Sequence, residues 1–322
     1  MKKTVPWILT AIFVVAVAAL CIYFSVTTLS STDYAMNTVI NITVKSRNPE
    51  EDIKAAIAEV KRIDALMSAT NSKSDICKIN SAPAGKAVEV SSETCKLISL
   101  ALEISEKSDG AFDISVNSLS ELWNINSPNP QVPPEEDIQE LLECTNYKDI
   151  ELDLKNNTVT LKKEKMSISL GAIAKGYAAD CVAKLLKDRG VSEAMIDLGG
   201  NVYVVGGEKT IGIQTPFEVR GEYFTTCKVA DKAVVTSGAY ERYFEKDGNI
   251  YHHIIDPKTG KPAESFLKSV TVISPDCELS DVLSTALYVA DEEKGRKILK
   301  RYNNVRIFFV DGNESLVEIK NN

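Results

Sequence analysis

The sequence predicts an α+β protein with mixed, largely antiparallel sheets and packed helices. Several short segments, beginning with residues 36–46, are rich in β-branched residues and alternate in polarity, which is typical of strands. Other segments carry apolar residues three and four positions apart, which is typical of amphipathic helices. Strand runs interleaved with helices favour the α+β class. The 322 residues allow one large domain or two small ones.

The first half of the body alternates between the two patterns. We expect a polar tether at 27–35, a strand at 36–46 and a helix over 49–70. In that helix Ile53, Ile57 and Val60 begin an apolar stripe. A second helix over 91–110 has serine and threonine near its start and Gly110 after its end. The proline-rich segment 126–137 is predicted to be a surface insertion.

The second half turns to strands from Ile150 onward. Residues 150–169 read as a hairpin with its turn at Asn156 and Asn157, followed by a helix over 171–190 that Gly190 closes. Further strands are expected at 195–207, 232–244 and 269–274. A helix over 278–291 and a short strand pair complete the chain.

The N-terminus predicts a membrane segment. Residues 5–26 form an uncharged run that is long enough for a transmembrane helix, and Lys2 and Lys3 precede this run. The positive-inside rule places the N-terminus in the cytoplasm and the body outside, at the cell membrane. We therefore divide the chain into an anchor or signal segment, 1–27, and one domain, 28–322. A cleaved signal peptide is the alternative, because residues 16–18 offer a small-residue cleavage site.

Composition narrows the classes of partner. The chain has 37 basic and 45 acidic side chains, for a net charge of −8, without basic clusters. This balance argues against nucleic acid as the main partner. The seven cysteines include no CxxC pair, and their spacing does not select disulfide partners. The two histidines are adjacent and no cysteine lies near them, which disfavours zinc.

One helix carries a candidate metal site. Asp281 and Thr285 are four residues apart, so both project from one helix face whose buried side is apolar. A carboxylate and a hydroxyl form a hard oxygen site of the kind that suits Mg²⁺. The alternative is a solvated aspartate near a helix start, stabilised by the helix dipole.

Other motifs lie where segments change type. The turns at 169–176 and 199–201 combine glycine with polar residues at strand ends, where backbone N–H groups can meet phosphate, or can simply form tight turns. His253 could be a base or a phosphate donor, or structural. The GAFD segment, 110–113, could bind a flat ring or plug the core.

These motifs, taken in order, resemble the ApbE-type FAD:protein FMN transferases. The resemblance runs from about Met36 to Asp291. It rests on MNT at 36–38, a serine-rich SDI-containing segment at 68–80, GAFD at 110–113, LW at 122–123, LGAIAKGYAAD at 170–180, DLGGN at 197–201, TSGAYERY at 236–243, HHIIDPKTG at 252–260 and DxxxT at 281–285.

The resemblance implies an ApbE-like fold and roles for particular residues. It implies that Mg²⁺ is bound by the side chains of Asp281 and Thr285 and by the carbonyl of Ala172. It makes His253 a candidate base or diphosphate contact. The residues that it implies for the FAD pocket are Met36, Thr70, Ala111, Phe112, Asp113, Ser169, Lys175 and Ile255.

The resemblance also implies an enzyme and its reaction. FMN is expected to pass from FAD to a threonine hydroxyl of a target flavoprotein, with release of AMP, outside the cytoplasm. Expected acceptors are subunits of membrane redox complexes or exported reductases. Two alternatives remain: an FAD pyrophosphatase that gives FMN and AMP, and a non-catalytic FAD-binding protein.

Three positions depart from the family pattern. Asn37 stands where glycine is usual, Thr70 where an aromatic residue is common, and Ser169 where aspartate is common. The last two departures bear on FAD affinity more than on metal binding, because the three implied metal ligands are all present.

Overall fold

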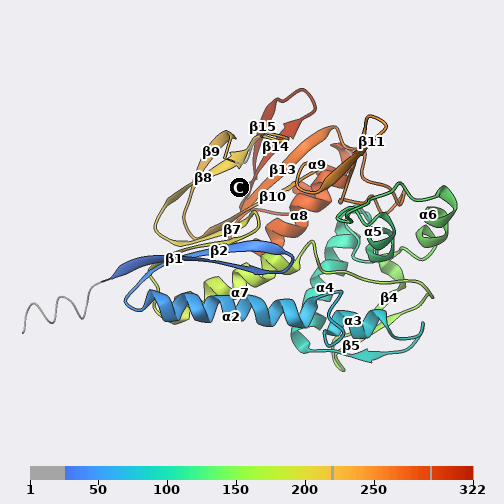
Figure 1. The fold of residues 1–322 in the computed structure, drawn as a ribbon, viewed down its shortest axis with the longest axis horizontal. Coiled ribbons are helices and arrows are strands. Elements are labelled where there is room, and N and C mark those ends of the chain that lie inside the picture. The colour runs from blue at the N-terminus through green and yellow to red at the C-terminus, as the bar shows by residue number, and fades with distance from the viewer. Residues whose placement is uncertain (1–25, 219–220, 291, 322) are drawn as a thin grey trace, which may run out of the picture.

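The computed structural model describes residues 26–218, 221–290 and 292–321 (Figure 1). The predicted anchor therefore lies almost wholly outside the described residues. Within the described residues, no helix combines the length and the apolar character that a membrane crossing requires.

One antiparallel sheet organises the molecule. Its eight strands run in the order β1-β2-β6-β7-β10-β13-β14-β15, and every neighbouring pair is antiparallel. The strands are β1 (Thr27–Ala35), β2 (Thr38–Ser46), β6 (Glu193–Leu198), β7 (Asn201–Gly206), β10 (Lys232–Gly238), β13 (Leu267–Ser274), β14 (Val305–Asp311) and β15 (Leu316–Asn321). The predicted α+β class with a largely antiparallel sheet is confirmed.

Three helices cover one face of this sheet. They are α2 (Pro49–Met67), α7 (Ala174–Asp188) and α8 (Cys277–Val289), and α7 packs between the other two. Their apolar stripes and the facing strand residues form the main hydrophobic core. On the opposite face the hairpin of β8 (Lys209–Gln214) and β9 (Tyr223–Val229) packs through a smaller apolar cluster.

A smaller lobe lies beside the ends of these helices (Figure 1). Its elements are α3 (Asp75–Asn80), α4 (Ser92–Lys107), α5 (Asn117–Trp123), α6 (Glu135–Leu142), the 3₁₀ turn η1 (Tyr147–Asp149) and a sheet of β3 (Val88–Glu89), β5 (Thr158–Leu161) and β4 (Ile150–Asp153). The hairpin of β11 (Tyr243–Lys246) and β12 (Asn249–His252) and helix α9 (Glu292–Leu299) complete the described fold.

The expected tether at 27–35 was wrong. This segment is strand β1, paired with β2 along its whole length, from Thr27 opposite Ser46 to Ala35 opposite Thr38. Most of its side chains are exposed, so the segment lacks the apolar alternation by which a strand is recognised. Backbone pairing with β2 makes it a strand.

The LGAIAKGYAAD motif joins helices α7 and α8. Asp180 of α7 accepts hydrogen bonds from the backbone N–H groups of Cys277 (2.9 Å) and Glu278 (2.8 Å), and so caps the start of α8. Gly176 lies where the helices approach most closely, because a Cβ atom there would stand 2.5 Å from the carbonyl oxygen of Cys277. This approach brings the predicted metal ligands of α8 to the turn before α7.

Candidate functional site

A pocket of about 240 Å³ lies where the large sheet, the α7–α8 pair and the smaller lobe meet. Every predicted site residue except Thr70 lines it. These residues are Met36, Ala111, Phe112, Asp113, Ser169, Ala172, Lys175, His253, Ile255, Asp281 and Thr285. They come from segments far apart in the sequence, and the structure therefore brings the predicted set together in one place.

Asp281 is a buried carboxylate of this pocket, with 3% of its surface exposed. Its Oδ2 accepts the backbone N–H of Gly176 at 2.9 Å. In a regular helix that N–H would bond the carbonyl of Ala172, four residues earlier. The bond to Asp281 therefore releases the Ala172 carbonyl for another partner. Thr285 lies one turn further along α8, with its hydroxyl 3.2 Å from that of Ser237.

Lys175 supplies positive charge beside this carboxylate. Its Nζ lies 3.9 Å from Asp281 Oδ2 and donates a hydrogen bond to the carbonyl of Gly171 at 3.0 Å. The ammonium group is thus held at the turn that precedes α7, on the wall of the pocket. Lys175 is the one charged side chain among the small and apolar residues of this turn.

The donor set fits a hard cation. It offers a carboxylate, a hydroxyl and a released carbonyl, all oxygen atoms of the type that Mg²⁺ prefers. With one carboxylate, such a site leaves positions for water or phosphate oxygens. Among the residues that the structure describes, no three histidine, cysteine or acidic side chains cluster as a metal site of their own.

His253 lines the same pocket, and its imidazole is neutral at physiological pH. Burial, followed by the positive charges of Arg242 and His252, lowers the pKa of its imidazole to about 3. Its Nδ1 lies 3.3 Å from the carbonyl oxygen of Arg242, which can only accept a hydrogen bond. The proton therefore sits on Nδ1, and Nε2 carries a free lone pair.

The depressed pKa of His253 predicts a pH dependence of stability. In the unfolded chain the imidazole takes up a proton below its ordinary pKa of 6.5, but in the folded protein only near pH 3. The folded protein therefore keeps the full contribution of neutral His253 to its stability above pH 6.5, and it loses that contribution as the pH falls towards 3. His253→Gln should therefore lose less melting temperature than the parent protein when the pH is lowered from about 7.5 to about 4.5. Equal losses of melting temperature in the variant and the parent would contradict this. His252 is present in both proteins, so its own titration does not affect the comparison.

The GAFD loop is fixed by its own aspartate. Asp113 accepts the N–H and the hydroxyl of Ser115 at 2.8 and 2.6 Å, and the N–H of Tyr147 at 2.8 Å. Burial raises the pKa of this carboxyl, against those hydrogen bonds. The loop thus presents Ala111 and Phe112 to the pocket in a defined position. Its predicted contact with FAD remains a prediction.

The departures from the family pattern have different structural settings. Asn37 has φ +58°, in the left-handed region that asparagine tolerates better than most residues, so it can replace a glycine there. Ser169 lines the pocket, and its hydroxyl accepts the N–H of Gly171 at 3.2 Å. Thr70 is exposed and hydrogen-bonds to Ser68, outside the set that lines the pocket.

Asn201 is a pocket residue for which the sequence suggested no role. It is 3% exposed, lines the pocket, and its Nδ2 has no hydrogen-bond partner among the described residues. A buried amide without a partner costs about 1–3 kcal/mol, so it marks a place where a ligand oxygen can bind. The DLGGN motif could have drawn attention to Asn201. That its amide lacks a hydrogen-bond partner depends on the folded surroundings and cannot be seen in the sequence.

Asn201→Leu should separate ligand binding from folding. Leucine has the same branched shape without polar atoms, and loss of the unpartnered amide offsets the cost of its larger volume, so the ligand-free protein should be about as stable as the parent. FAD affinity should fall by about tenfold or more. Calorimetry and a flavin fluorescence titration measure the two quantities, with the exposed Asn249→Leu of β12 as control. Unchanged FAD affinity would show that the amide does not contact the nucleotide.

Comparison with known proteins matches this sequence and this fold. The family model of the ApbE family matches residues 36–309. A curated FAD:protein FMN transferase from Klebsiella pneumoniae (strain 342) is 38% identical over 80% of this chain and 81% of its own. Another, from Treponema pallidum (strain Nichols), is 32% identical over 87% and 84%.

Solved structures agree in fold. The ApbE protein of Thermotoga maritima has a TM-score of 0.83 and 36% identity, covering 90% of this chain and 96% of its own. The flavinyl transferase ApbE of Pseudomonas stutzeri, in its apo form, has a TM-score of 0.78 and 28% identity, over 92% and 96%.

Proposed function

The chain belongs to the ApbE family, and on that premise we propose that it transfers FMN from FAD to a threonine hydroxyl of a target flavoprotein in a Mg²⁺-dependent reaction. Its curated relatives carry the name FAD:protein FMN transferase, and the chain is an enzyme of that class, a transferase of a phosphorus-containing group. The observation that carries the proposal is the convergence of the buried Asp281 with the partly buried Thr285, Lys175 and His253 on one pocket.

Different residues of the pocket serve different parts of the proposed reaction. The acceptor hydroxyl attacks the flavin-side phosphorus, the bond from that phosphorus to the oxygen of the AMP phosphate breaks, and AMP leaves. His253, which is neutral, would accept the proton of the hydroxyl at Nε2. Lys175 is placed to meet the negative charge of the diphosphate.

Asp281, Thr285 and the Ala172 carbonyl would hold Mg²⁺. When bound, the ion supplies charge stabilisation for phosphate oxygens. Asp281 owes its position to the Gly176 N–H, and Thr285 owes its position to the same helix. No covalent nucleophile of this chain is required.

Mass spectrometry tests the transfer directly. The protein is incubated with FAD, Mg²⁺ and the soluble domain of a flavin-carrying subunit of a membrane redox complex, and the intact mass of that domain and the AMP released are measured. Added FMN mass that requires Mg²⁺ supports the proposal. AMP release at the full rate without an acceptor would instead indicate an FAD pyrophosphatase, and FAD retained without AMP would indicate a binding protein.

We also propose that the segment 1–27 anchors the domain 28–322 on the extracytoplasmic side of the cell membrane. The support is the uncharged run 5–26 behind two lysines. Acceptors would then be subunits of membrane redox complexes or exported reductases. Protease treatment of intact spheroplasts tests this, because digestion of the body without lysis is expected, and full protection would contradict it.

A further inference from the structure

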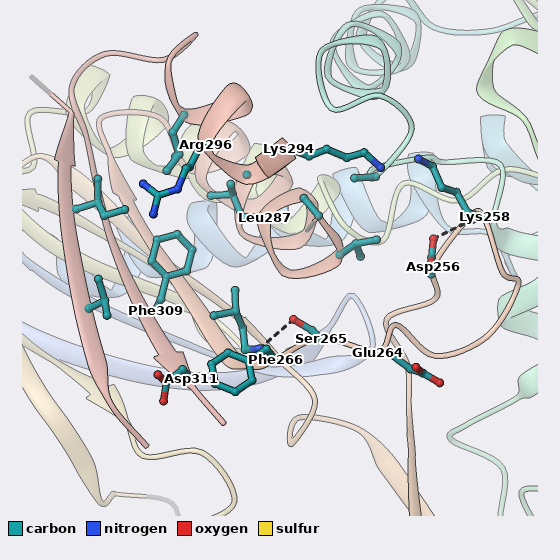
Figure 2. Close-up of a pocket in the computed structure, with 18 residues that line it drawn as sticks. Asp256, Lys258, Glu264, Ser265, Phe266, Leu287, Lys294, Arg296, Phe309 and Asp311 are labelled. Atoms are coloured by element: carbon teal, nitrogen blue, oxygen red, sulfur yellow. Dashed lines mark hydrogen bonds between the residues drawn. The ribbon is translucent and has the colours of Figure 1, made fainter. Parts of the chain in front are cut away.

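A second, larger pocket adjoins the catalytic one. It has a volume of about 950 Å³ and lies between α9, the C-terminal part of α8, the strands β14 and β15, and the segment 264–267 (Figure 2). None of the predicted FAD or metal residues lines it except Ala111, which lines both pockets. We call it the outer groove.

The floor of the outer groove is apolar. Leu287, Leu299, Phe309, Val317 and Ile319 supply it, from α8, α9, β14 and β15. At its rim stands Phe266, which is 65% exposed, while Val317 is 49% exposed. Figure 2 shows Phe266 and Phe309 on the same side of the groove. Exposed apolar side chains that gather around one depression are typical of a surface that binds a partner.

Two lysines gather at one end of the outer groove. Lys258 and Lys294 extend towards each other there (Figure 2), and both lie near one carboxylate oxygen of Asp109, at 3.7 and 3.9 Å. The Asp109 side chain is 80% exposed. The two ammonium groups lie close together, and Lys294 is the chief cause of the lowered pKa of Lys258. An acidic group brought by a partner would be attracted to the two ammonium groups.

The charged end is continuous with the catalytic pocket. Asp256 and Lys258 line the outer groove, whereas Ile255 and Pro257 line the catalytic pocket, so a single turn forms the wall between them. On α8, Thr285 faces the catalytic pocket and Leu287, two residues later, faces the groove. A chain lying in the groove could therefore place a neighbouring residue at the catalytic pocket.

The catalytic pocket leaves little room for a protein. Its volume is about 240 Å³, and FAD has to bind there as well. A protein acceptor can place only a side chain there and needs further surface beside it, since stable recognition buries about 800 Å² on each partner. The outer groove is adjacent, apolar at its centre and charged at its end.

We propose that the outer groove is the docking site for the acceptor protein, whose segment next to the modified hydroxyl places apolar side chains on the floor and an acidic side chain between Lys258 and Lys294. This inference rests on the proposed function. It names the surface that selects the acceptor, separate from the residues that hold FAD and metal. A second copy of the chain is the competing occupant.

Two variants test the docking site. Phe266→Ala removes the exposed aromatic ring at the rim, and the double variant Lys258→Glu, Lys294→Glu reverses the charged end. The acceptor probe is the flavin-carrying domain of the transfer assay, varied in concentration at saturating FAD. Each variant should raise the acceptor KM by about tenfold or more. FAD affinity should not change, because these side chains lie outside the catalytic pocket.

Matched controls lie on β9, away from both pockets. Tyr223→Ala removes a ring that is 60% exposed, and Lys228→Glu reverses a lysine whose side chain is 70% exposed. Both should leave the acceptor KM unchanged. Elution volume in size-exclusion chromatography is measured for all variants.

The outcomes are distinct. If the parent protein flavinylates no acceptor, the proposed function fails and the docking site fails with it. If it does, and the groove variants keep the parental acceptor KM, the docking site alone is refuted. Loss of FAD affinity would assign the groove to the nucleotide, and a change from dimer to monomer would assign it to self-association; either overturns the proposal.

Discussion

Asp281→Asn is expected to abolish Mg²⁺ binding and to lower metal-dependent AMP release by at least about a hundredfold. Asp281 is the carboxylate of the donor set, and it is buried beside the ammonium of Lys175 at 3.9 Å. An amide keeps an oxygen in the same position but removes the negative charge. Isothermal titration with Mg²⁺ in the absence of FAD measures the affinity, and nucleotide chromatography measures AMP.

The same residue also has a structural task, so the choice of substitution matters. Its Oδ2 accepts the N–H of Gly176, and asparagine can still accept that bond through its carbonyl oxygen. Asp281→Ala removes the acceptor and should cost about 1–3 kcal/mol of unfolding free energy. Asp281→Asn should therefore melt close to the parent protein, whereas Asp281→Ala should melt lower.

A control lies at the start of the same helix. Asp276→Asn changes an exposed carboxylate just before α8 and should leave Mg²⁺ affinity unchanged. Parental Mg²⁺ affinity in Asp281→Asn would remove Asp281 from the metal site. A large drop in its melting temperature with normal activity per folded molecule would make its role structural.

The sequence predicted long elements well and short or edge elements poorly. The helix expected over 49–70 is α2, Pro49–Met67, because nineteen residues carry enough apolar repeats to define a face. Helices α3, α5 and α6 have six, seven and eight residues, too few for such a pattern. Strand β1 was missed for a related reason: its side chains are mostly exposed, and its pairing partner was not visible in one segment.

The candidate site, too, could be predicted from the sequence only in part. Motifs and their order identified residues that the fold brings to one pocket, among them Lys175 and Asp281. The consequences of burial were not visible beforehand. The unpartnered amide of Asn201 and the depressed pKa of His253 depend on neighbours that folding supplies. The exposed position of Thr70 likewise follows from its turn with Ser68.

Gly176 allows the close packing of α7 against α8 and donates its N–H to Asp281, and Gly176→Ala should disturb both. A Cβ atom there would lie 2.5 Å from the carbonyl oxygen of Cys277 and 2.7 Å from Cα of Glu278. These are backbone atoms and cannot rotate away, so α7 and α8 have to separate. Overpacking of this kind costs about 1–3 kcal/mol, and the higher helix propensity of alanine returns at most about 1 kcal/mol.

Separation of the helices also reaches the metal site. The Gly176 N–H donates to Asp281 at 2.9 Å, so moving α7 away from α8 lengthens this bond and frees the carboxylate to rotate. Gly176→Ala should therefore lower the melting temperature and weaken Mg²⁺ binding together. Differential scanning calorimetry and Mg²⁺ titration measure the two effects on the same sample.

Gly295→Ala is the matched control, because it adds the same methyl group to a helical glycine of α9. The nearest atom to its Cβ would be in the Leu287 side chain, at 3.8 Å, which is an ordinary contact. The control should be as stable as the parent or gain up to about 1 kcal/mol, with normal Mg²⁺ affinity. If Gly176→Ala behaved like Gly295→Ala, the close approach of α7 and α8 would not be what positions Asp281. A drop in stability with intact Mg²⁺ affinity would separate helix packing from the metal site.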